Sequence, residues 1–175
     1  MSIETQKALV ERRSVRRYTD EMPKEEQIQA ILEAGLYAAT GRDSQGVRFV
    51  VVENQEVIQN LERINARIME KPDAHPFYGA PCLITIFADG ERPTWLQDGS
   101  LAVGNMMLAA HNEGLGSCWI NRAYETFEEE DGKALRQSWG LSDNWKGIAH
   151  LILGYVDGAY PKASPRQSDR VIYVK

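Results

Sequence analysis

The chain has 175 residues, of which 43% are hydrophobic and 26% charged, the composition of an ordinary globular domain. A chain of this length buries roughly 70% of its extended surface, so it needs no disulfide or structural metal to hold a core. Its 20 Lys and Arg residues against 25 Asp and Glu residues give a net charge of −5, which argues against a protein that binds nucleic acid or an anionic membrane. We expect one domain over residues 1–175.

The cysteines, the histidines and the N-terminus set expectations about compartment and metal binding. Cys82 and Cys118 lie in apolar runs and form no redox or zinc motif, which suits a reducing cytosol. The N-terminal segment carries charges where a signal peptide needs an apolar stretch, and no apolar run is long enough to span a membrane. His75, His111 and His150 have no ligand-like neighbours at helical spacing. We therefore expect a cytoplasmic protein without a metal site.

The first half of the chain alternates helical and extended patterns. Pro23 fits the first turn of a helix that Thr40 and Gly41 end, and Asn54 is the expected N-cap of the helix that follows. The apolar run at residues 82–87 predicts a strand that is buried on both faces. The expected helices cover residues 3–13, 23–40 and 54–68, and the expected strands cover residues 47–52 and 82–87.

The second half continues this mixture and ends in an arm. Its expected helices cover residues 96–111 and 126–139, and its expected strands cover residues 117–120, 148–156 and 171–174. The first of these helices is almost free of charge and belongs at the centre of a fold or at an interface, and Thr126 opens the second with a capping box. An arm rich in Pro, Ser and basic residues precedes the last apolar strand, which needs a partner strand. The pattern predicts the α+β or α/β class.

The strongest local signal is a cluster of basic residues near the N-terminus. Four of the 20 basic residues, Arg12, Arg13, Arg16 and Arg17, lie within six positions. Two like charges ~6 Å apart repel by roughly 3 kcal/mol at an effective dielectric of ~20, so a partly buried cluster needs an anion. In extended chain Ser14 and Arg16 point to one face, as a phosphate site requires. The pattern leaves two interpretations, a phosphate site and a solvated basic face.

Other features are better explained by structure than by chemistry. Gly114-Leu115-Gly116 follows a helix and lacks the third glycine of a dinucleotide fingerprint, so we interpret it as a helix stop. Cys118 beside Trp119 fits an inert small hydrophobic residue better than a nucleophile. The acidic run at residues 128–131 fits the solvated first turn of a helix.

Four stretches together resemble the short form of the nitroreductase family of FMN-dependent oxidoreductases. They are RRSVRRY, AATGRDSQGVRFVVV, DGSLAVGNMMLAAHNEGLGSCWIN and PKASPRQ, and they occur in the family's order over nearly the whole chain. The resemblance implies an α+β sandwich, with a mostly antiparallel sheet flanked by helices, in an intertwined homodimer. It also implies that the C-terminal arm, about residues 158–175, is swapped onto the partner subunit and adds a strand to its sheet.

The resemblance assigns an FMN site in each of two clefts at the subunit interface. The phosphate and ring contacts fall on Arg12, Arg13, Ser14, Arg16 and Arg166. The partner's segment that packs on the ring matches Ala39, Thr40, Gly41 and Gln45, and the stretch beside the ring's N5 and O4 matches Trp119, Ile120 and Asn121. Arg16 falls at the ring's N1 and O2 edge, where a cation stabilises the reduced flavin. No catalytic side chain is expected, because flavin N5 is the reactive centre.

Three residues depart from the family pattern. Asp43 and Gly46 stand where many relatives have Asn and Pro, and Asn121 stands where the family often has glycine. A carboxylate near the ring opposes the anionic reduced flavin, so Asp43 predicts a lower reduction potential than in relatives.

The implied activity is an oxidoreductase that works by a ping-pong mechanism. NADPH or NADH gives hydride to the flavin, and a nitroaromatic, quinone, enone or flavin acceptor takes the electrons. Two alternatives remain, an FMN-binding sensor or storage module without turnover, and a structural dimer with a solvated basic face.

Overall fold

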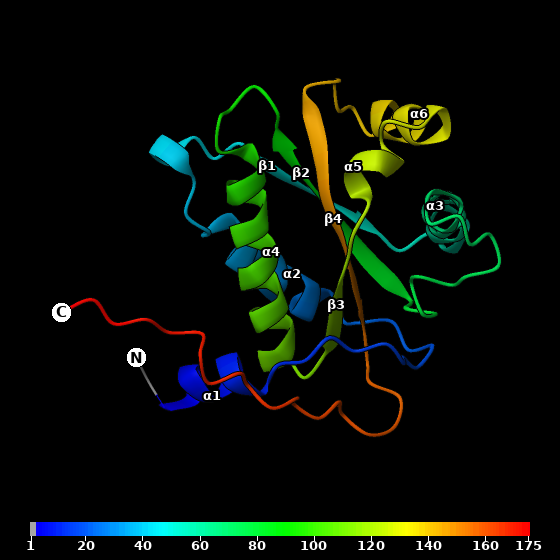
Figure 1. Cartoon of the computed structure of the whole chain (residues 1–175). Coiled ribbons are helices and arrows are strands. Elements are labelled where there is room, and N and C mark those ends of the chain that lie inside the picture. The colour runs from blue at the N-terminus through cyan, green and yellow to red at the C-terminus, as the bar shows by residue number, and fades with distance from the viewer. Residues whose placement is uncertain (1–2) are drawn as a thin grey trace.

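A computed structural model describes residues 3–175 and contains, within them, a four-stranded antiparallel sheet in the order β1-β2-β4-β3 (Figure 1). The strands are β1 (Val47–Val52), β2 (Cys82–Asp89), β3 (Gly116–Ile120) and β4 (Trp145–Gly154). The helices are α1 (Ile3–Glu11), α2 (Glu25–Leu36), α3 (Gln55–Ile68), α4 (Trp95–Asn112), α5 (Ala123–Thr126) and α6 (Glu130–Ser138), with a short 3-10 helix η1 (Gly41–Asp43). The predicted α+β sandwich is confirmed.

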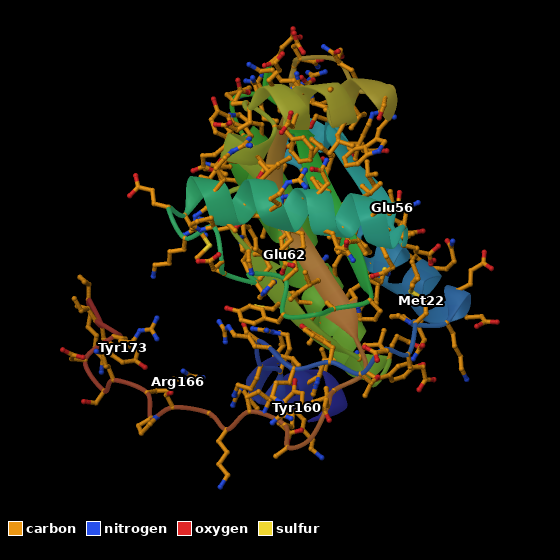
Figure 2. All side chains as sticks on the ribbon, turned by 90° about the vertical axis from the view of Figure 1, so that its right-hand side faces the viewer. Met22, Glu56, Glu62, Tyr160, Arg166 and Tyr173 are labelled. Carbon is orange, nitrogen blue, oxygen red and sulfur yellow. The ribbon has the colours of Figure 1, made fainter. Side chains whose placement is uncertain are left out.

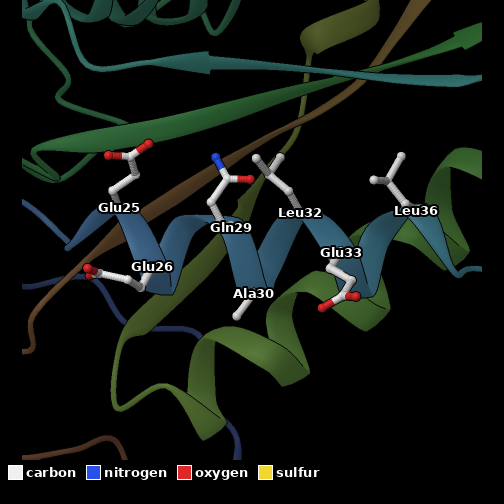
Figure 3. A pocket seen from close by; sticks show the side chains of 7 residues that line it. All are labelled: Glu25, Glu26, Gln29, Ala30, Leu32, Glu33 and Leu36. Carbon is white, nitrogen blue, oxygen red and sulfur yellow. The ribbon is translucent and has the colours of Figure 1, made fainter.

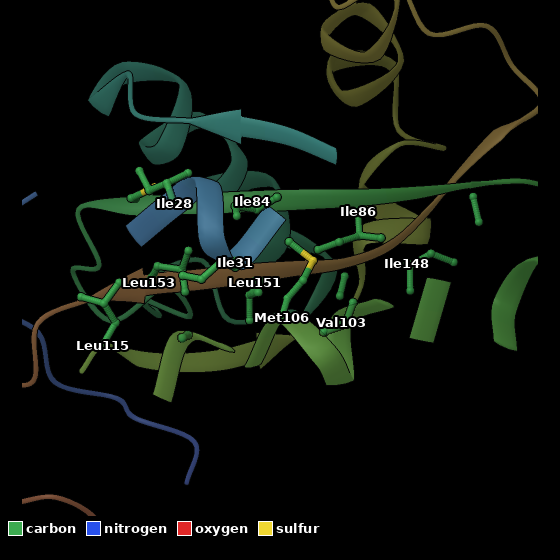
Figure 4. Packing of buried hydrophobic residues seen from close by; sticks show 14 residues of the cluster. Ile28, Ile31, Ile84, Ile86, Val103, Met106, Leu115, Ile148, Leu151 and Leu153 are labelled. Atoms are coloured by element: carbon green, nitrogen blue, oxygen red, sulfur yellow. The ribbon is translucent and has the colours of Figure 1, made fainter. Parts of the chain in front are cut away.

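One hydrophobic layer joins α2 and α4 to the sheet (Figure 4). Val103 and Met106 of α4 are fully buried against Ile84 and Ile86 of β2. Close approach of α4 to β4 depends on Gly99, since an added Cβ there would lie 2.5 Å from Cγ1 of Ile148. The nearly uncharged helix therefore packs at the centre of the fold, as its composition predicts.

A second layer covers the opposite face of the sheet with α3, α5 and α6 (Figure 1). Aromatic rings pack inside it, and the rings of Phe87 and Phe127 lie 4.6 Å apart between centroids. His150 of β4 is fully buried among them, with its ring centroid 5.3 Å from that of Phe77. Because both layers contact β2, this strand is buried along nearly its whole length, as predicted.

Several element boundaries follow from local chemistry. The β-branched run at residues 47–52 forms β1 as predicted. The Asn54 side chain caps α3 by accepting hydrogen bonds from the backbone N–H groups of Glu56 and Val57, at 3.0 and 3.1 Å. The left-handed backbone of Gly114 (φ 76°) follows the end of α4, so the glycine pair is a helix stop.

The predicted capping box at Thr126 is wrong. Thr126 is the last residue of α5, its side chain is buried, and α6 begins only at Glu130 after the N-cap Glu129. Gly132 packs directly on the Thr126 carbonyl, so the two short helices meet at a tight corner instead of forming one. The second helix also begins later than expected, because Pro23 lies ahead of the N-cap Lys24.

The arm after β4 has no helix or strand within the chain itself. It passes α1 and then projects away from the body of the molecule (Figure 1). The side chains of residues 171–174 are 65–96% exposed. The strand expected here has no partner within the described chain, and its exchange between subunits stays a prediction. No helix within residues 3–175 is long and apolar enough to cross a bilayer.

Candidate functional site

The basic cluster follows α1 as extended chain laid along the outer edge of β3. The Val15 N–H donates to the Ser117 carbonyl at 3.0 Å, and Ser14 pairs with Ser117 in a parallel bridge. Gly116 permits this approach, since an added Cβ would lie 2.9 Å from Cβ of Val15. The Tyr18 hydroxyl donates to the Val15 carbonyl at 2.8 Å. α1 thus ends at Glu11, before the expected helix end at residue 13, and extended chain follows it.

The arginines of the cluster have different surroundings. Arg17 forms an ion pair with Asp157 at 2.9 Å, and both side chains are largely exposed. Nη1 of Arg13 donates to the carbonyls of Val10 and Arg12, at 2.7 and 2.6 Å. Within residues 3–175, Nη1 of Arg12 and Nε of Arg13 are buried without any hydrogen-bond partner. The interpretation as a solvated basic face therefore fits Arg17 but not Arg12 or Arg13.

These unpaired guanidinium nitrogens fit an anionic group. A buried donor without a partner costs about 1–3 kcal/mol, more if it is charged, and phosphate oxygens would remove that cost. The Arg16 guanidinium lies 5.8 Å from the ring centroid of Tyr78, which contacts it from the loop before β2. The cluster thus offers donors of the kind that the phosphate of FMN requires.

Two titratable groups next to the cluster stay protonated near neutral pH. Burial raises the pKa of the Cys118 thiol, although nearby Arg16 and a hydrogen bond to Ser14 oppose the shift. Burial also raises the pKa of the Tyr18 hydroxyl. Neither group is a thiolate or phenolate nucleophile, in agreement with the inert role expected for Cys118.

Tyr160, at the root of the arm, ties the cluster to the end of α4. Its hydroxyl accepts a hydrogen bond from the Arg13 N–H at 2.9 Å and lies 3.1 Å from Nδ1 of His111. Figure 2 shows Tyr160 beside α1, while Arg166 lies on the projecting arm. The described chain does not bring Arg166 to the other arginines.

A second group of predicted site residues lies in the loop from Ala39 to Gln45, at the other end of α4. The Gly41 N–H donates to Oδ1 of Asp98 at 3.0 Å, and the Gln45 N–H donates to Oγ1 of Thr40 at 3.1 Å. The other carboxylate oxygen of Asp98 accepts a hydrogen bond from the Thr94 hydroxyl at 3.0 Å.

The backbone of this loop is strained. Arg42, Asp43 and Gln45 have left-handed φ angles of 55°, 53° and 49°, which non-glycine residues seldom adopt. The buried carboxylate of Asp98 holds the loop against this strain. Sequence reasoning missed Asp98, although an acidic residue in an otherwise uncharged helix was a usable signal.

The two groups are far apart within one chain. Asp98 holds the loop, and His111 contacts the tyrosine that binds the arginine segment. At 1.5 Å per residue along α4, these two positions are separated by about 20 Å. One chain therefore does not surround a single flavin ring with both groups.

The third group lies at the end of β3, beside the arginine segment. The Ile120 side chain belongs to the core, so this residue offers only its backbone, while Trp119 is half-buried and Asn121 exposed. In this turn Arg122 has a left-handed backbone (φ 73°), whereas Asn121 does not. Asn65, which sequence reasoning missed, is fully buried and donates from Nδ2 to the Asn121 carbonyl at 2.8 Å, fixing this turn.

A groove of about 640 Å³ along α2 offers different chemistry (Figure 3). Glu25, Glu26 and Glu33 line it together with uncharged side chains of the same helix. Three carboxylates repel a phosphate, so this groove is not a candidate cofactor site.

Comparison with known proteins identifies the family. The sequence profile described as the nitroreductase family matches residues 9–155. A Methanothermobacter thermautotrophicus protein provisionally named NADH dehydrogenase/NAD(P)H nitroreductase is 31% identical over 157 residues, which cover 85% of this chain and 75% of that protein. An Archaeoglobus fulgidus protein of the same name is 31% identical over 154 residues, which cover 85% of this chain and 83% of that protein.

Solved structures agree. A Bacteroides fragilis nitroreductase with bound FMN superposes with a TM-score of 0.91 at 29% identity, over 99% of this chain and all of the other. A Desulfitobacterium hafniense nitroreductase with bound FMN has a TM-score of 0.87 at 29% identity over the whole of both chains. The chain belongs to the nitroreductase family, an assignment that makes it a flavin oxidoreductase and confirms the resemblance found in the sequence.

Proposed function

We propose that the protein is an FMN-dependent, NAD(P)H-oxidising reductase whose residues 1–175 form one cofactor-binding domain. The observation that carries this proposal is the pair of buried arginine nitrogens, on Arg12 and Arg13, that have no partner in the described part of the chain. The FMN found in two solved relatives supports the choice of anion.

The predicted contact residues bind different parts of the flavin. Arg12, Arg13 and Ser14 hold the phosphate, where charge-assisted hydrogen bonds are shorter and stronger than neutral ones. Arg16 places positive charge near the ring's N1 and O2 edge, and the Tyr78 ring limits its movement. The backbone of residues 119–121 borders the N5 side.

FMN supplies the electron chemistry when bound: it accepts hydride from NADPH or NADH at N5 and, after the nicotinamide leaves, reduces a nitroaromatic, quinone, enone or flavin acceptor in a ping-pong sequence. The protein binds and orients the flavin and sets the charge around its ring. The raised pKa values of Tyr18 and Cys118 keep both groups protonated, so neither acts as a base at neutral pH. We therefore assign no catalytic side chain.

We further propose that the active form is a homodimer, because one chain leaves its site incomplete. The exposed face of α4 carries Leu101, Gly104, Asn105 and the half-buried Leu108, with no charge among them. Two such helices packed antiparallel would bring the loop of one subunit, with Ala39, Thr40, Gly41 and Gln45, to the arginine segment of the other. Arg166 would arrive on the partner's arm.

The edge of β1 is the proposed binding site for that arm. A groove of about 450 Å³ runs along residues 47–50 of β1. Leu32 and Leu36 of α2 line one part of it, and Trp139 and Leu141 line another. An unpaired strand edge with apolar walls suits the apolar residues 171–174 of a second copy. Both cysteines are buried and unbonded, which agrees with action in the cytoplasm.

Equilibrium titration of the flavin-stripped protein with FMN and with riboflavin tests the phosphate assignment. Riboflavin lacks the phosphate and keeps the ring, so FMN should bind at least about tenfold more tightly, since one charge-assisted hydrogen bond contributes ~1.5–3 kcal/mol. Equal affinity for the two flavins, or no flavin binding, contradicts the proposal.

A further inference from the structure

A small basic cavity lies beside the strained loop, at the end of α4 that is far from the arginine cluster. It has a volume of about 150 Å³ and lies between η1 and the connection from β2 to α4; we call it the η1 pocket. Its lining residues are Gly41, Arg42, Ser44, Arg92, Pro93 and Thr94. Two of them are arginines and none is acidic.

Several polar groups of the η1 pocket have donors without a hydrogen-bond partner. The Ser44 hydroxyl is buried and has no hydrogen-bond partner within the described chain. The Arg42 side chain forms no ion pair or hydrogen bond with any residue from 3 to 175. Arg92 uses only Nε, which lies 3.3 Å from Oδ2 of Asp89. These donors surround a cavity that a single anionic group would fill.

The nearby carboxylates already have hydrogen-bond or ion-pair partners. Both carboxylate oxygens of Asp98 accept hydrogen bonds, from Gly41 and Thr94. Asp89 accepts from the Asn144 amide, which holds the pKa of that carboxyl below its usual range, and it also pairs with Arg92. The exposed Asp43 lies 3.5 Å from the Gln45 amide. The exposed Arg42 therefore has no carboxylate partner among the described residues.

The backbone presents these groups in a fixed arrangement. Arg42 is left-handed, a conformation that costs non-glycine residues roughly 1–2 kcal/mol. Gly41 has no room for a Cβ, which would lie 2.2 Å from Oγ1 of Thr94, and the Ser44 N–H donates to its carbonyl at 3.2 Å. Strain held in place by neighbouring contacts is a feature of binding sites.

We propose that the η1 pocket binds a phosphomonoester, namely the 2′-phosphate of NADPH. The inference rests on the proposed function and adds to it a preference for NADPH over NADH. A cavity of about 150 Å³ has room for a phosphate group but not for a whole nucleotide, since pockets for drug-sized ligands measure roughly 300–1,000 Å³. The pocket shares Gly41 with the loop assigned to the ring, so a dinucleotide docked over the ring reaches it with its adenosine end.

Calorimetric titration of the FMN-loaded protein with 2′-AMP, 5′-AMP and inorganic phosphate tests the pocket without any redox turnover. We expect 2′-AMP to bind more tightly than the other two probes. Arg42→Ala and Arg92→Ala should each weaken 2′-AMP by about tenfold or more, since each removes charge-assisted hydrogen bonds. Arg63→Ala, an exposed arginine on α3, is the matched control and should bind 2′-AMP as the wild type does.

The same variants should raise KM for NADPH by a similar factor and leave KM for NADH unchanged. Unaltered 2′-AMP affinity in both arginine variants, or equal weakening of 5′-AMP, overturns the proposal. Inorganic phosphate that binds as tightly as 2′-AMP assigns the pocket to free phosphate and overturns the NADPH assignment. A protein that binds FMN and 2′-AMP but is not reduced by either nicotinamide contradicts the proposed function alone.

Discussion

At the scale of single residues, the site depends on which arginine nitrogens lack a partner. Arg12→Ala removes a guanidinium whose buried Nη1 has no partner within residues 3–175, so FMN affinity should fall by about 1.5–3 kcal/mol. Riboflavin affinity should not change, because riboflavin has no phosphate. Arg17→Ala is the control, since that side chain pairs with Asp157 in solvent. Flavin fluorescence titration measures all three proteins, and an Arg12→Ala variant with wild-type FMN affinity contradicts the assignment.

Asp43 provides a test of the ring environment. It is exposed in the strained loop proposed to contact the flavin, and negative charge there opposes the negative charge that reduction adds. Asp43→Asn should therefore raise the reduction potential of bound FMN. Anaerobic reductive titration measures the shift, and a potential that stays constant or falls rejects the prediction.

His150 predicts how the fold responds to acid. Its ring is fully buried, Nδ1 lies 3.0 Å from Oγ1 of Thr85, and burial lowers its pKa from 6.5 to about 3. Between these values the unfolded chain binds a proton that the folded chain does not. The free energy of unfolding therefore falls as pH drops from 6.5 toward 3, by up to ~1.4 kcal/mol per pH unit.

Urea unfolding at pH 7 and pH 4.5 measures this dependence. His150→Gln should reduce the stability difference between the two pH values, while His75→Gln, at an exposed position, should keep it. The same pH dependence in His150→Gln and wild type argues against a buried neutral histidine.

Sequence reasoning found the residues whose signal is local. The arginines stand side by side in the chain, so the order of amino acids alone reveals their clustering. Asp98, Asn65 and Tyr160 were missed because each bonds to a backbone group 57, 56 and 147 positions away, respectively. Only the fold brings such pairs together.

At the scale of elements, a hydrogen bond to Asp98 connects α4 to the loop from Ala39 to Gln45. Asp98→Ala removes the acceptor of the Gly41 N–H, so the strained loop should open more often and the free energy of unfolding should fall by about 1–3 kcal/mol. Asp98→Asn keeps an acceptor and should lose less. Hydrogen exchange at residues 41–46 with urea unfolding measures both effects, and unchanged exchange in Asp98→Ala contradicts the role given to this carboxylate.

Elements with strong periodicity were predicted well, and short ones were not. The strand at residues 47–52 and the helix capped by Asn54 match the structure because β-branching and capping act locally. The corner between α5 and α6 was missed because Ala123 and Phe127 are drawn into the core, which buries Thr126 where it cannot cap a helix.

At the scale of the whole molecule, sequence patterns predicted the mixture of helices and strands but not the order β1-β2-β4-β3, which long-range pairing decides. The C-terminal arm shows the same limit, since residues 171–174 pair with no strand of the described chain. Truncation before Val171 should loosen the proposed dimer by removing the apolar residues that would seat on β1. Sedimentation velocity over a concentration series measures this, and a truncated protein that dimerises as tightly as the full chain contradicts the exchange of arms.

The proposed reductase activity is tested most directly by the visible spectrum of the FMN-loaded protein during anaerobic addition of NADPH, and separately of NADH. We expect the yellow colour to bleach with about one nicotinamide consumed per flavin, and to return when an acceptor such as a quinone is added. Bound flavin that stays yellow with both nicotinamides would contradict the proposed reductase activity and indicate a storage or sensing role instead.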